Sequence, residues 1–389
     1  MADKLSAEFT GISTQLVHSG ANPLDFFGFV NPPVVRASTV LFPAADIMKK
    51  GAQPYTYGIH GTPTTKALTD CLNQLEGSVK TFLVPSGLAA ITVALLGTLK
   101  AGDHLLIVDS VYKPTRLFVD NVLKKFGIEV EFYNPLGGIA NLIRPNTKVI
   151  YTESPGSNTF EIQDIDSIVK TAHAVNALVL LDNTWATPIF FKPIEHGVDI
   201  SINAATKYQA GHSDILMGYI STNETTTAHI EETYTDLGMS VSGDDAYLVL
   251  RSIRSMNLRL TYQQDSALFI AKWLEDQPEV SAVLHPALES HPQHALWKQN
   301  FKGSSGLFSF VLNSGGEREA HAFLDALKLF GLGYSWGSFE SLAVHVNLDD
   351  RLFNRDQFQT PVIRLQIGLE ERDDLIKDLR NGLDALKNI

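Results

Sequence analysis

The sequence predicts an α/β fold, in which a large domain with a mostly parallel sheet precedes a smaller C-terminal α+β domain. Two observations lead to this prediction. Short apolar runs alternate with helical patterns from about residue 62 to residue 253, as expected for parallel strands buried on both faces. Several of these runs end in a polar residue, which is typical of a site at the carboxyl ends of the strands.

Residues 1–61 are predicted to form an N-terminal arm. Prolines such as Pro32 and Pro33 recur along this stretch, and prolines at this density prevent long helices. Aromatic side chains lie between them, among them Phe26, Phe27 and Phe29. Because this apolar content has no regular pattern, we expect the arm to bury itself against a neighbouring subunit.

The large domain is predicted to span residues 62–253. The helical spacing of Leu68, Cys71 and Leu72 predicts a helix over 64–77 that stops at Gly77. The elements that follow are a strand at 81–84, a turn at 85–87, an apolar helix to about residue 100, a strand at 104–109, a helix at 115–126, and strands at 148–153, 178–182 and 199–202.

The smaller domain is predicted to span residues 254–389. A long helical pattern from residue 243 to about residue 274 connects the two domains. Strand-like segments follow at 307–312 and 362–367, and a charged amphipathic helix at 373–386 closes the chain. This part is therefore expected to be α+β.

Composition excludes several functions. The 389-residue chain has 43 acidic and 31 basic residues and a net charge of −12, so it lacks the basic surface that nucleic acid or an anionic membrane requires. Its single cysteine, Cys71, permits no disulfide within the chain and fits a reducing compartment. The stretch from Met1 to Ser6 has no apolar run like that of a secretory signal, and the run from Leu88 to Leu99 is too short to span a bilayer. We expect a cytoplasmic protein with no nucleic-acid or membrane partner.

Common cofactor and metal motifs are absent from the sequence, which has no G-x-G-x-x-G after a strand, no Walker A loop, no H-E-x-x-H and no C-x-x-C. His285, His291 and His294 cluster, but no cysteine or carboxylate set accompanies them, so we expect a surface loop and no metal. The Gly-His-Ser-Asp segment at 211–214 holds the residue types of a hydrolase triad, but triads are assembled in space and not from adjacent residues. Cys71 is expected to be a packed core thiol.

Three elements form a candidate cofactor site. Asp182 ends one apolar strand and Lys207 follows the next, where partial desolvation lowers the pKa of a lysine and frees its amine as nucleophile and base. Asp182 is placed to hold the ring nitrogen of pyridoxal phosphate. The strand-to-helix turn at Ser86, Gly87 and Leu88 offers backbone N–H groups to a phosphate. From these residues alone, an alternative interpretation is that Lys207 is a solvated surface lysine, Asp182 caps a helix and residues 86–88 form an ordinary turn.

Longer motifs strengthen the cofactor interpretation. The segments 153–157, 182–186, 205–208, 211–214, 303–310, 334–337 and 363–370 resemble motifs of the pyridoxal-phosphate enzymes of cysteine and methionine metabolism, and the resemblance runs from about Thr14 to the C-terminus. It implies the fold-type I pyridoxal-phosphate transferase architecture, with pyridoxal 5′-phosphate as cofactor. It also implies a homotetramer, a dimer of dimers in which neighbouring subunits share active sites.

The resemblance implies a role for each candidate residue. Lys207 binds the cofactor covalently and acts as a base, Asp182 pairs with the ring nitrogen, and Tyr112 stacks on the ring as a second catalytic residue. The remaining contacts are to the phosphate, from Ser86, Gly87, Leu88 and Thr206, to the substrate, from Arg364, Ser335, Trp336 and Tyr112, and to the neighbouring subunit's phosphate, from Tyr57. A planar and permanently charged guanidinium such as that of Arg364 suits a carboxylate.

One position departs from the family pattern. The family usually carries an arginine two residues after this tyrosine, and here the residue is Ile59. His60 follows, but we expect an extended segment, in which adjacent side chains point to opposite faces. Weaker cofactor binding is one expectation, and compensation by His60 or by another cation is the other.

The resemblance is strongest to the bacterial β-lyases of the family. It implies a carbon–sulfur lyase of methionine biosynthesis and transsulfuration, which cleaves L-cystathionine or a related cysteine S-conjugate to a thiol (homocysteine), pyruvate and ammonia. Segments 334–336 and 156–158 favour this activity, since relatives of the γ type usually carry Glu-Ser-Leu and Asn-Pro there. A γ-lyase or γ-synthase is one alternative, and a non-catalytic descendant with weakened cofactor binding is the other.

Overall fold

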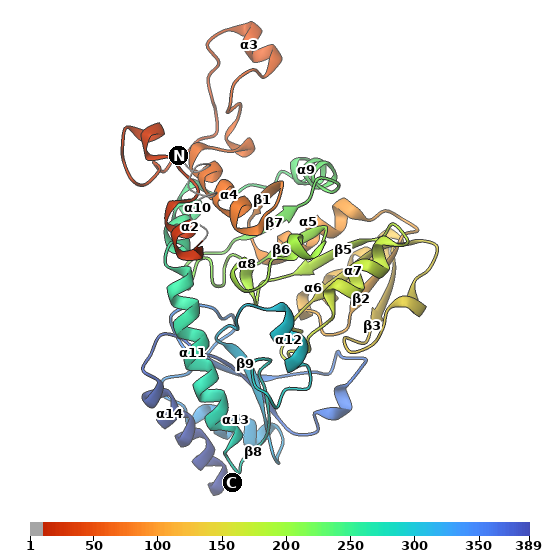
Figure 1. Ribbon diagram of the computed structural model, residues 1–389, viewed down its shortest axis with the longest axis vertical. Helices are drawn as coiled ribbons and strands as arrows, with labels where there is room; N and C mark the ends of the chain where they lie inside the picture. Colours follow the sequence, from red (N-terminus) through yellow and green to blue (C-terminus); the bar gives the residue numbers. More distant parts are fainter. Residues whose placement is uncertain (1–10) are drawn as a thin grey trace.

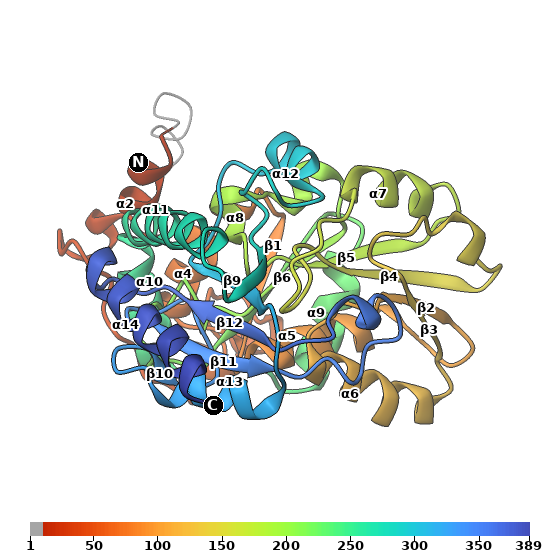
Figure 2. The same cartoon turned by 90° about the horizontal axis from the view of Figure 1, so that it is seen from below.

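Two sheets make up the body of the molecule. The computed structural model describes residues 11–389, so the stretch from Met1 to Ser6 lies outside the described residues. Figure 1 shows one sheet in the upper part of the body and the other below it, and Figure 2 shows the same arrangement from below. None of the described helices is both long enough and apolar enough to cross a lipid bilayer.

The larger sheet has the strand order β1-β7-β6-β5-β4-β2-β3. Among these described strands only β7 runs antiparallel to its neighbours, so the predicted mostly parallel sheet is confirmed. The strands are β1 (Lys80–Val84), β2 (His104–Val108), β3 (Glu129–Tyr133), β4 (Thr147–Glu153), β5 (Leu178–Asp182), β6 (Ile200–Asn203) and β7 (Gly218–Thr222).

Two of these strands, β3 and β7, were not predicted, because neither has the continuous apolar run that marks the other strands in the sequence. Strand β3 reads Glu-Val-Glu-Phe-Tyr and lies at the sheet edge, so charged residues interrupt its apolar run. Strand β7 begins at Gly218, where a Cβ atom would lie 2.3 Å from the carbonyl oxygen of Ser86. Glycine weakens a strand pattern but permits this close approach of two backbones.

Helices α4 (Pro63–Glu76) and α5 (Gly87–Thr98) pack on the same end of the larger sheet, against β1 and β7. Helix α4 ends at Gly77, which has φ +67°, as the sequence predicts. Cys71 is fully buried in α4 with its sulfur 3.0 Å from the Ser19 hydroxyl, which confirms the packed core thiol. The other helices of this part are α6 (Lys113–Asn121), α7 (Ile165–His173), α8 (Thr187–Phe190) and α9 (Thr227–Asp236).

The prediction of a single helix over residues 243–274 is wrong. The structure has two helices there, α10 (Gly243–Ile253) and α11 (Met256–Glu275). At the break the carbonyl oxygen of Ser252 accepts hydrogen bonds from the Ser255 backbone, the Ser255 hydroxyl and the Arg259 guanidinium. Side chains that compete for a backbone acceptor in this way weaken a helix from within.

The smaller sheet has the strand order β10-β11-β12-β9-β8, antiparallel except for the β10–β11 pair. The sequence predicts only its two most apolar strands, β9 and β12. The strands are β8 (Val280–Leu284), β9 (Leu307–Leu312), β10 (Gly331–Leu332), β11 (Leu342–Val346) and β12 (Val362–Gln366), and the helices are α12 (His294–Asn300), α13 (Glu317–Asp325) and α14 (Arg372–Ala385).

The expected surface loop of histidines is wrong for two of its three members. His285 and His291 are buried, at 0% and 6% exposure. The His285 ring packs against Phe308 at 5.4 Å between centroids, and its Nδ1 accepts a hydrogen bond from the Ala287 backbone. Burial lowers the pKa of His285 to about 3, so the ring is neutral and acts as an acceptor within the turn.

The N-terminal arm projects away from the body of the molecule, and Figure 1 shows its helix α3 (Ala45–Lys50) at the tip of this projection. A second short helix, α2 (Ile12–His18), lies against α4 and α11. The arm is anchored where the Val35 backbone donates to the Thr64 hydroxyl. Several of its apolar side chains lie in solvent, with Phe27 97% exposed and Phe29 70% exposed, whereas Leu16 in α2 is buried.

Candidate active site

Most of the sequence-predicted residues, though not Tyr57 or Ser335, line one cavity at the carboxyl ends of the parallel strands. Strands β5 and β6 are parallel neighbours, with Asp182 opposite Ile202, so Asp182 and the segment after β6 reach the same sheet edge. The cavity has a volume of about 210 Å³. Of the predicted site residues, its lining includes Ser86, Gly87, Leu88, Tyr112, Asp182, Thr206, Lys207, Trp336 and Arg364.

Lys207 brings a desolvated amine to this cavity. Its Nζ donates a 2.7 Å hydrogen bond to the hydroxyl of Ser335 and lies 5.2 Å from the centre of the Trp336 ring. Burial, with a smaller effect of the Arg364 charge, lowers the pKa of Lys207 to about 8, and Asp182 opposes the shift. About one tenth of the amine is therefore neutral at pH 7, and the neutral amine is the form that attacks an aldehyde or removes a proton.

Asp182 presents one free oxygen to the cavity. Its Oδ1 accepts from the Thr184 backbone (3.0 Å) and the Thr184 hydroxyl (2.6 Å), whereas Oδ2 has no hydrogen-bond partner within residues 11–389. Burial raises the pKa of Asp182. A cationic ring N–H at Oδ2 would satisfy this oxygen and stabilise the carboxylate.

The N-terminus of α5 offers free backbone N–H groups to the cavity. The hydroxyl of Ser86 caps the helix by accepting from the Ala89 backbone at 3.0 Å. The N–H groups of Gly87 and Leu88 have no acceptor among the hydrogen bonds of the described chain, and such free N–H groups attract anions. A Cβ at Gly87 would come within 2.5 Å of Ala204, so only glycine lets the helix end approach the lysine-bearing segment.

Arg364 supplies a positive charge to the same cavity. It projects from β12, and its Nη1 donates to the Asn158 side chain at 3.1 Å. Burial lowers its pKa to about 10, so the group stays charged at neutral pH. Within the described residues it forms no ion pair with a carboxylate, and it is therefore available for a substrate carboxylate.

Two residues that the sequence analysis did not assign also shape the cavity. Glu153, at the end of β4, accepts a 2.7 Å hydrogen bond from the Tyr112 backbone and so fixes the start of α6. Burial and the Asp182 charge raise the pKa of Glu153 well above its ordinary value. Asn158 holds Arg364 in place. The position of Glu153 at a strand end was a signal that could have found it.

Tyr57 does not line this cavity, and its side chain is 48% exposed on the arm. Tyr57 itself has an extended backbone, but the extended segment expected at Ile59 and His60 is wrong, because Gly58–His60 forms a 3₁₀ turn. A Cβ at Gly58 would lie 1.9 Å from the Ala37 carbonyl oxygen, so only glycine permits this close approach of the two backbones at the start of the turn. The turn brings Tyr57 and His60 together, with ring centroids 6.2 Å apart, as residues three apart in such a turn eclipse.

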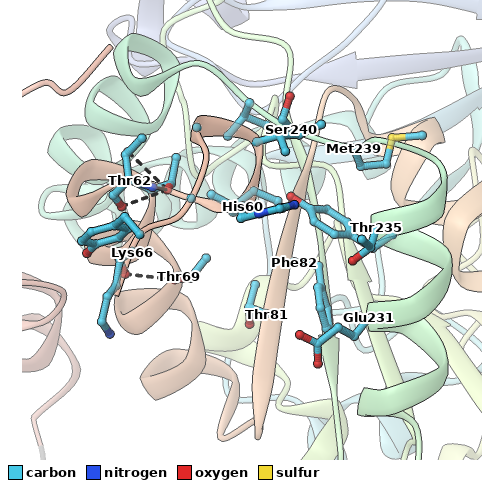
Figure 3. A pocket seen from close by; sticks show the side chains of 18 of the residues that line it. His60, Thr62, Lys66, Thr69, Thr81, Phe82, Glu231, Thr235, Met239 and Ser240 are labelled. Carbon is cyan, nitrogen blue, oxygen red and sulfur yellow. Dashed lines mark hydrogen bonds between the residues drawn. The ribbon is translucent and has the colours of Figure 1, made fainter. Parts of the chain in front are cut away.

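Ile59 and His60 line a second cavity of about 380 Å³ between the arm, α4 and α9. Figure 3 shows His60 pointing into it toward Thr235 and Phe82. Ile59 therefore faces a pocket of its own chain, and this pocket lies apart from Lys207 and Asp182.

The comparisons with known proteins agree with this geometry. Residues 13–384 match the model of the Cys/Met metabolism PLP-dependent enzyme family, and the chain belongs to that family. Its cofactor is therefore pyridoxal 5′-phosphate, and the free Asp182 oxygen, the α5 N–H groups and the desolvated Lys207 amine fit that molecule.

Several relatives are similar over nearly the whole chain. A provisionally named cystathionine β-lyase of Rhizobium johnstonii is 56% identical and covers 99% of both chains. The cystathionine β-lyase of Haemophilus influenzae is 41% identical over 96% of this chain and 98% of its own, and the L-alanine/L-glutamate racemase of Wolbachia pipientis is 41% identical over 95% and 96%.

A solved structure confirms the fold class. The cystathionine γ-synthase of Xanthomonas oryzae superposes with a TM-score of 0.91 at 30% identity, covering 97% of this chain and 99% of its own. The fold-type I pyridoxal-phosphate architecture that the resemblance implied is therefore confirmed, together with the larger mostly parallel sheet and the smaller second sheet.

Proposed function

We propose that the protein is a carbon–sulfur β-lyase that cleaves L-cystathionine, or a related cysteine S-conjugate, to a thiol, pyruvate and ammonia. The observation that carries the proposal is the desolvated Lys207 amine set between Asp182 and Arg364. The names of the Haemophilus and Rhizobium relatives support the choice of substrate.

Each side chain has a distinct task in this reaction. When bound, pyridoxal phosphate supplies an electron sink for the carbanion that forms at Cα. Arg364 holds the substrate α-carboxylate. The Asp182 carboxylate keeps the ring nitrogen protonated through Oδ2. Lys207 Nζ takes the Cα proton, and Lys207 or Tyr112 then gives a proton to the sulfur as the Cβ–S bond breaks. Water converts the three-carbon fragment to pyruvate and ammonia.

A substrate panel with product identification tests the activity. A β-lyase releases pyruvate and homocysteine from L-cystathionine, whereas a γ-acting enzyme yields 2-oxobutyrate. A colourless protein that stays colourless with added pyridoxal phosphate would instead point to the non-catalytic alternative. Dominant 2-oxobutyrate would contradict the proposal.

A racemase is the second candidate, because a relative 41% identical over 95% of the chain carries that name. Racemisation also begins with removal of the Cα proton and then requires a proton donor on the opposite face. Tyr112 and Lys207 line the same cavity and are the two groups such a reaction would use. Incubation with L-alanine and chiral analysis for D-alanine tests it.

The assembly we infer is a homotetramer, a dimer of dimers, in the cytoplasm. The exposed aromatic side chains of the arm support a subunit contact, since large exposed apolar surfaces mark interaction sites. In this assembly residues 1–61 form the arm, 62–253 the cofactor domain and 254–389 the small domain. Tyr57 would reach the neighbouring subunit's phosphate, which agrees with its exposure and its distance from its own cavity. Light scattering and sedimentation test the tetramer.

A further inference from the structure

A buried carboxyl group lies beneath the active site and takes no part in the chemistry described so far. Glu76 ends helix α4 but is 0% exposed. Its Oε1 accepts hydrogen bonds from the Asn203 amide nitrogen (3.0 Å) and from the Tyr219 hydroxyl (2.9 Å). The Tyr219 oxygen in turn accepts from the Gln209 amide nitrogen at 3.1 Å. All four side chains are fully buried.

This network encloses the segment that carries the reactive lysine. Asn203 is the last residue of β6 and Gln209 lies two residues after Lys207. Residues 204–208 therefore form a short span whose two ends are both tied, directly or through Tyr219, to one carboxyl group. A shift of either end would move the lysine backbone, because the span is short.

The surroundings of Glu76 favour a neutral carboxylic acid. Within residues 11–389 no cation lies within ion-pair distance of it. Its Oε2 and the amide oxygens of Asn203 and Gln209 are buried without partners, so the cluster holds acceptors that lack donors, and a proton on Oε2 supplies one.

The titratable groups that face Glu76 do not favour its ionised form strongly. Tyr219 from β7 and Cys71 from α4 have pKa values raised by burial and stay neutral. Among the described residues, Lys192 is the cation whose charge acts on Glu76, and it is paired with Glu195 at 3.1 Å. Burial raises the pKa of Glu76 to about 7, against the smaller effects of Tyr219, Ser201 and Lys192.

We propose that Glu76 is a positioning residue for Lys207: its buried carboxyl group ties helix α4 to both ends of the span 204–208. The proposal rests on the proposed function only in that Lys207 is the reacting amine. Glu76 touches neither substrate nor cofactor, and it acts through Asn203 and the Tyr219–Gln209 pair.

Three variants separate this role from general support of the core. Glu76→Gln keeps a neutral side chain of the same size, Glu76→Ala removes the hub, and Tyr219→Phe removes only the hydroxyl that reaches Gln209. Asp378→Ala is the matched control, because Asp378 is also a buried carboxyl, accepting from the backbones of Lys328 and Leu329 far from Lys207.

The first readout uses the apoprotein and needs neither substrate nor cofactor. The rate at which a small amine-reactive reagent acylates Lys207 is measured as a function of pH, and peptide mass spectrometry identifies the labelled residue. In Glu76→Ala we expect the midpoint to rise by about one pH unit as water enters the span and desolvation weakens. Glu76→Gln and Asp378→Ala should keep the wild-type midpoint, and Tyr219→Phe should fall between.

The second readout is turnover by the holoenzyme. For Glu76→Ala we expect kcat to fall about tenfold with KM nearly unchanged, and Glu76→Gln to restore it to within about twofold. An unchanged labelling midpoint and kcat in Glu76→Ala would overturn the proposal, as would equal damage in Glu76→Gln. If Glu76→Ala does not fold, wild-type behaviour of Tyr219→Phe overturns it. If the wild type does not turn over cystathionine but the variants change the labelling midpoint as expected, only the proposed function is contradicted.

Discussion

The amine of Lys207 donates a 2.7 Å hydrogen bond to the hydroxyl of Ser335, a residue 128 positions further along the chain. Ser335 has φ +81°, in the left-handed region. At the neighbouring Gly337 a Cβ would lie 3.1 Å from the Lys207 backbone. The turn at 335–337 is thus pressed against the lysine, and the smaller-sheet part of the chain supplies the acceptor that orients the amine.

Replacement of this acceptor should slow the reaction. In Ser335→Ala the amine loses its partner and samples other rotamers, so we expect kcat to fall about tenfold. Ser338→Ala is the control, because the buried Ser338 hydroxyl has no hydrogen-bond partner in the described chain. Steady-state kinetics with cystathionine decide this, and equal kcat in the two variants would show that the contact does not orient the amine.

Lys207 should cost the apoprotein stability below pH 8. Its folded pKa of about 8 lies below the ordinary lysine pKa of 10.5, so between these pH values the unfolded chain binds more protons and stability rises with pH. Lys207→Met should therefore stabilise the apoprotein at pH 7 by about 2 kcal/mol and abolish turnover. Urea unfolding at pH 7 and pH 10 measures this, and a stabilisation that is the same at both pH values would contradict the sign.

Asp182→Asn should retain the cofactor but lose activity. The amide cannot hold a proton on the ring nitrogen, so we expect kcat to fall by about 10²–10³. The expected spectrum still shows bound pyridoxal phosphate, since Lys207 and the α5 N–H groups remain. Loss of cofactor with no effect on the kcat of the reconstituted enzyme would mean that Asp182 only supports binding.

Arg364→Lys should weaken substrate capture. A lysine cannot form the paired contact with a carboxylate, and we expect kcat/KM to fall about thirtyfold, equivalent to about 2 kcal/mol. Arg380→Lys, in α14 on the far side of the smaller sheet, should leave kcat/KM unchanged. Similar values for both variants would remove Arg364 from the substrate site.

The arm should influence cofactor retention through its 3₁₀ turn. His60 lies beside Tyr57, so His60→Ala is expected to speed loss of the cofactor during dialysis. Ile59→Arg restores the usual family residue and is expected to slow that loss. Absorbance of the retained cofactor after dialysis reports both variants, and identical loss from the wild type and both variants would separate this turn from the phosphate.

Local patterns were sufficient for most of the fold and for bringing most of the candidate-site residues to one cavity. Asp182, Lys207 and Ser86 could be predicted because each follows a continuous apolar strand, and parallel strands bring such ends together. Strand β3 and the break between α10 and α11 could not, since alternating charges hide the first and a competition for the Ser252 carbonyl decides the second. The buried state of His285 depends on contact with Phe308, a residue distant in sequence.

Contacts between distant segments explain what the sequence could not show of the site. Glu76 carries no motif, and its importance appears only where α4 meets β6 and β7. The turn at Gly58–His60 depends on the nearby backbone of Ala37. Patterns of neighbouring residues contain no information on such approaches.

Because the candidate site is divided between two sheets, activity and secondary structure should be lost at different temperatures on heating. Lys207 follows a strand of the larger sheet, whereas Arg364 lies on β12 and Ser335 precedes β11 of the smaller one. A slight loosening between the layers would part these groups while every helix and strand stays intact. On heating, activity should therefore be lost at a lower temperature than the circular dichroism signal. A substrate analogue that contacts residues from both sheets should bring the temperature of inactivation closer to the temperature of unfolding.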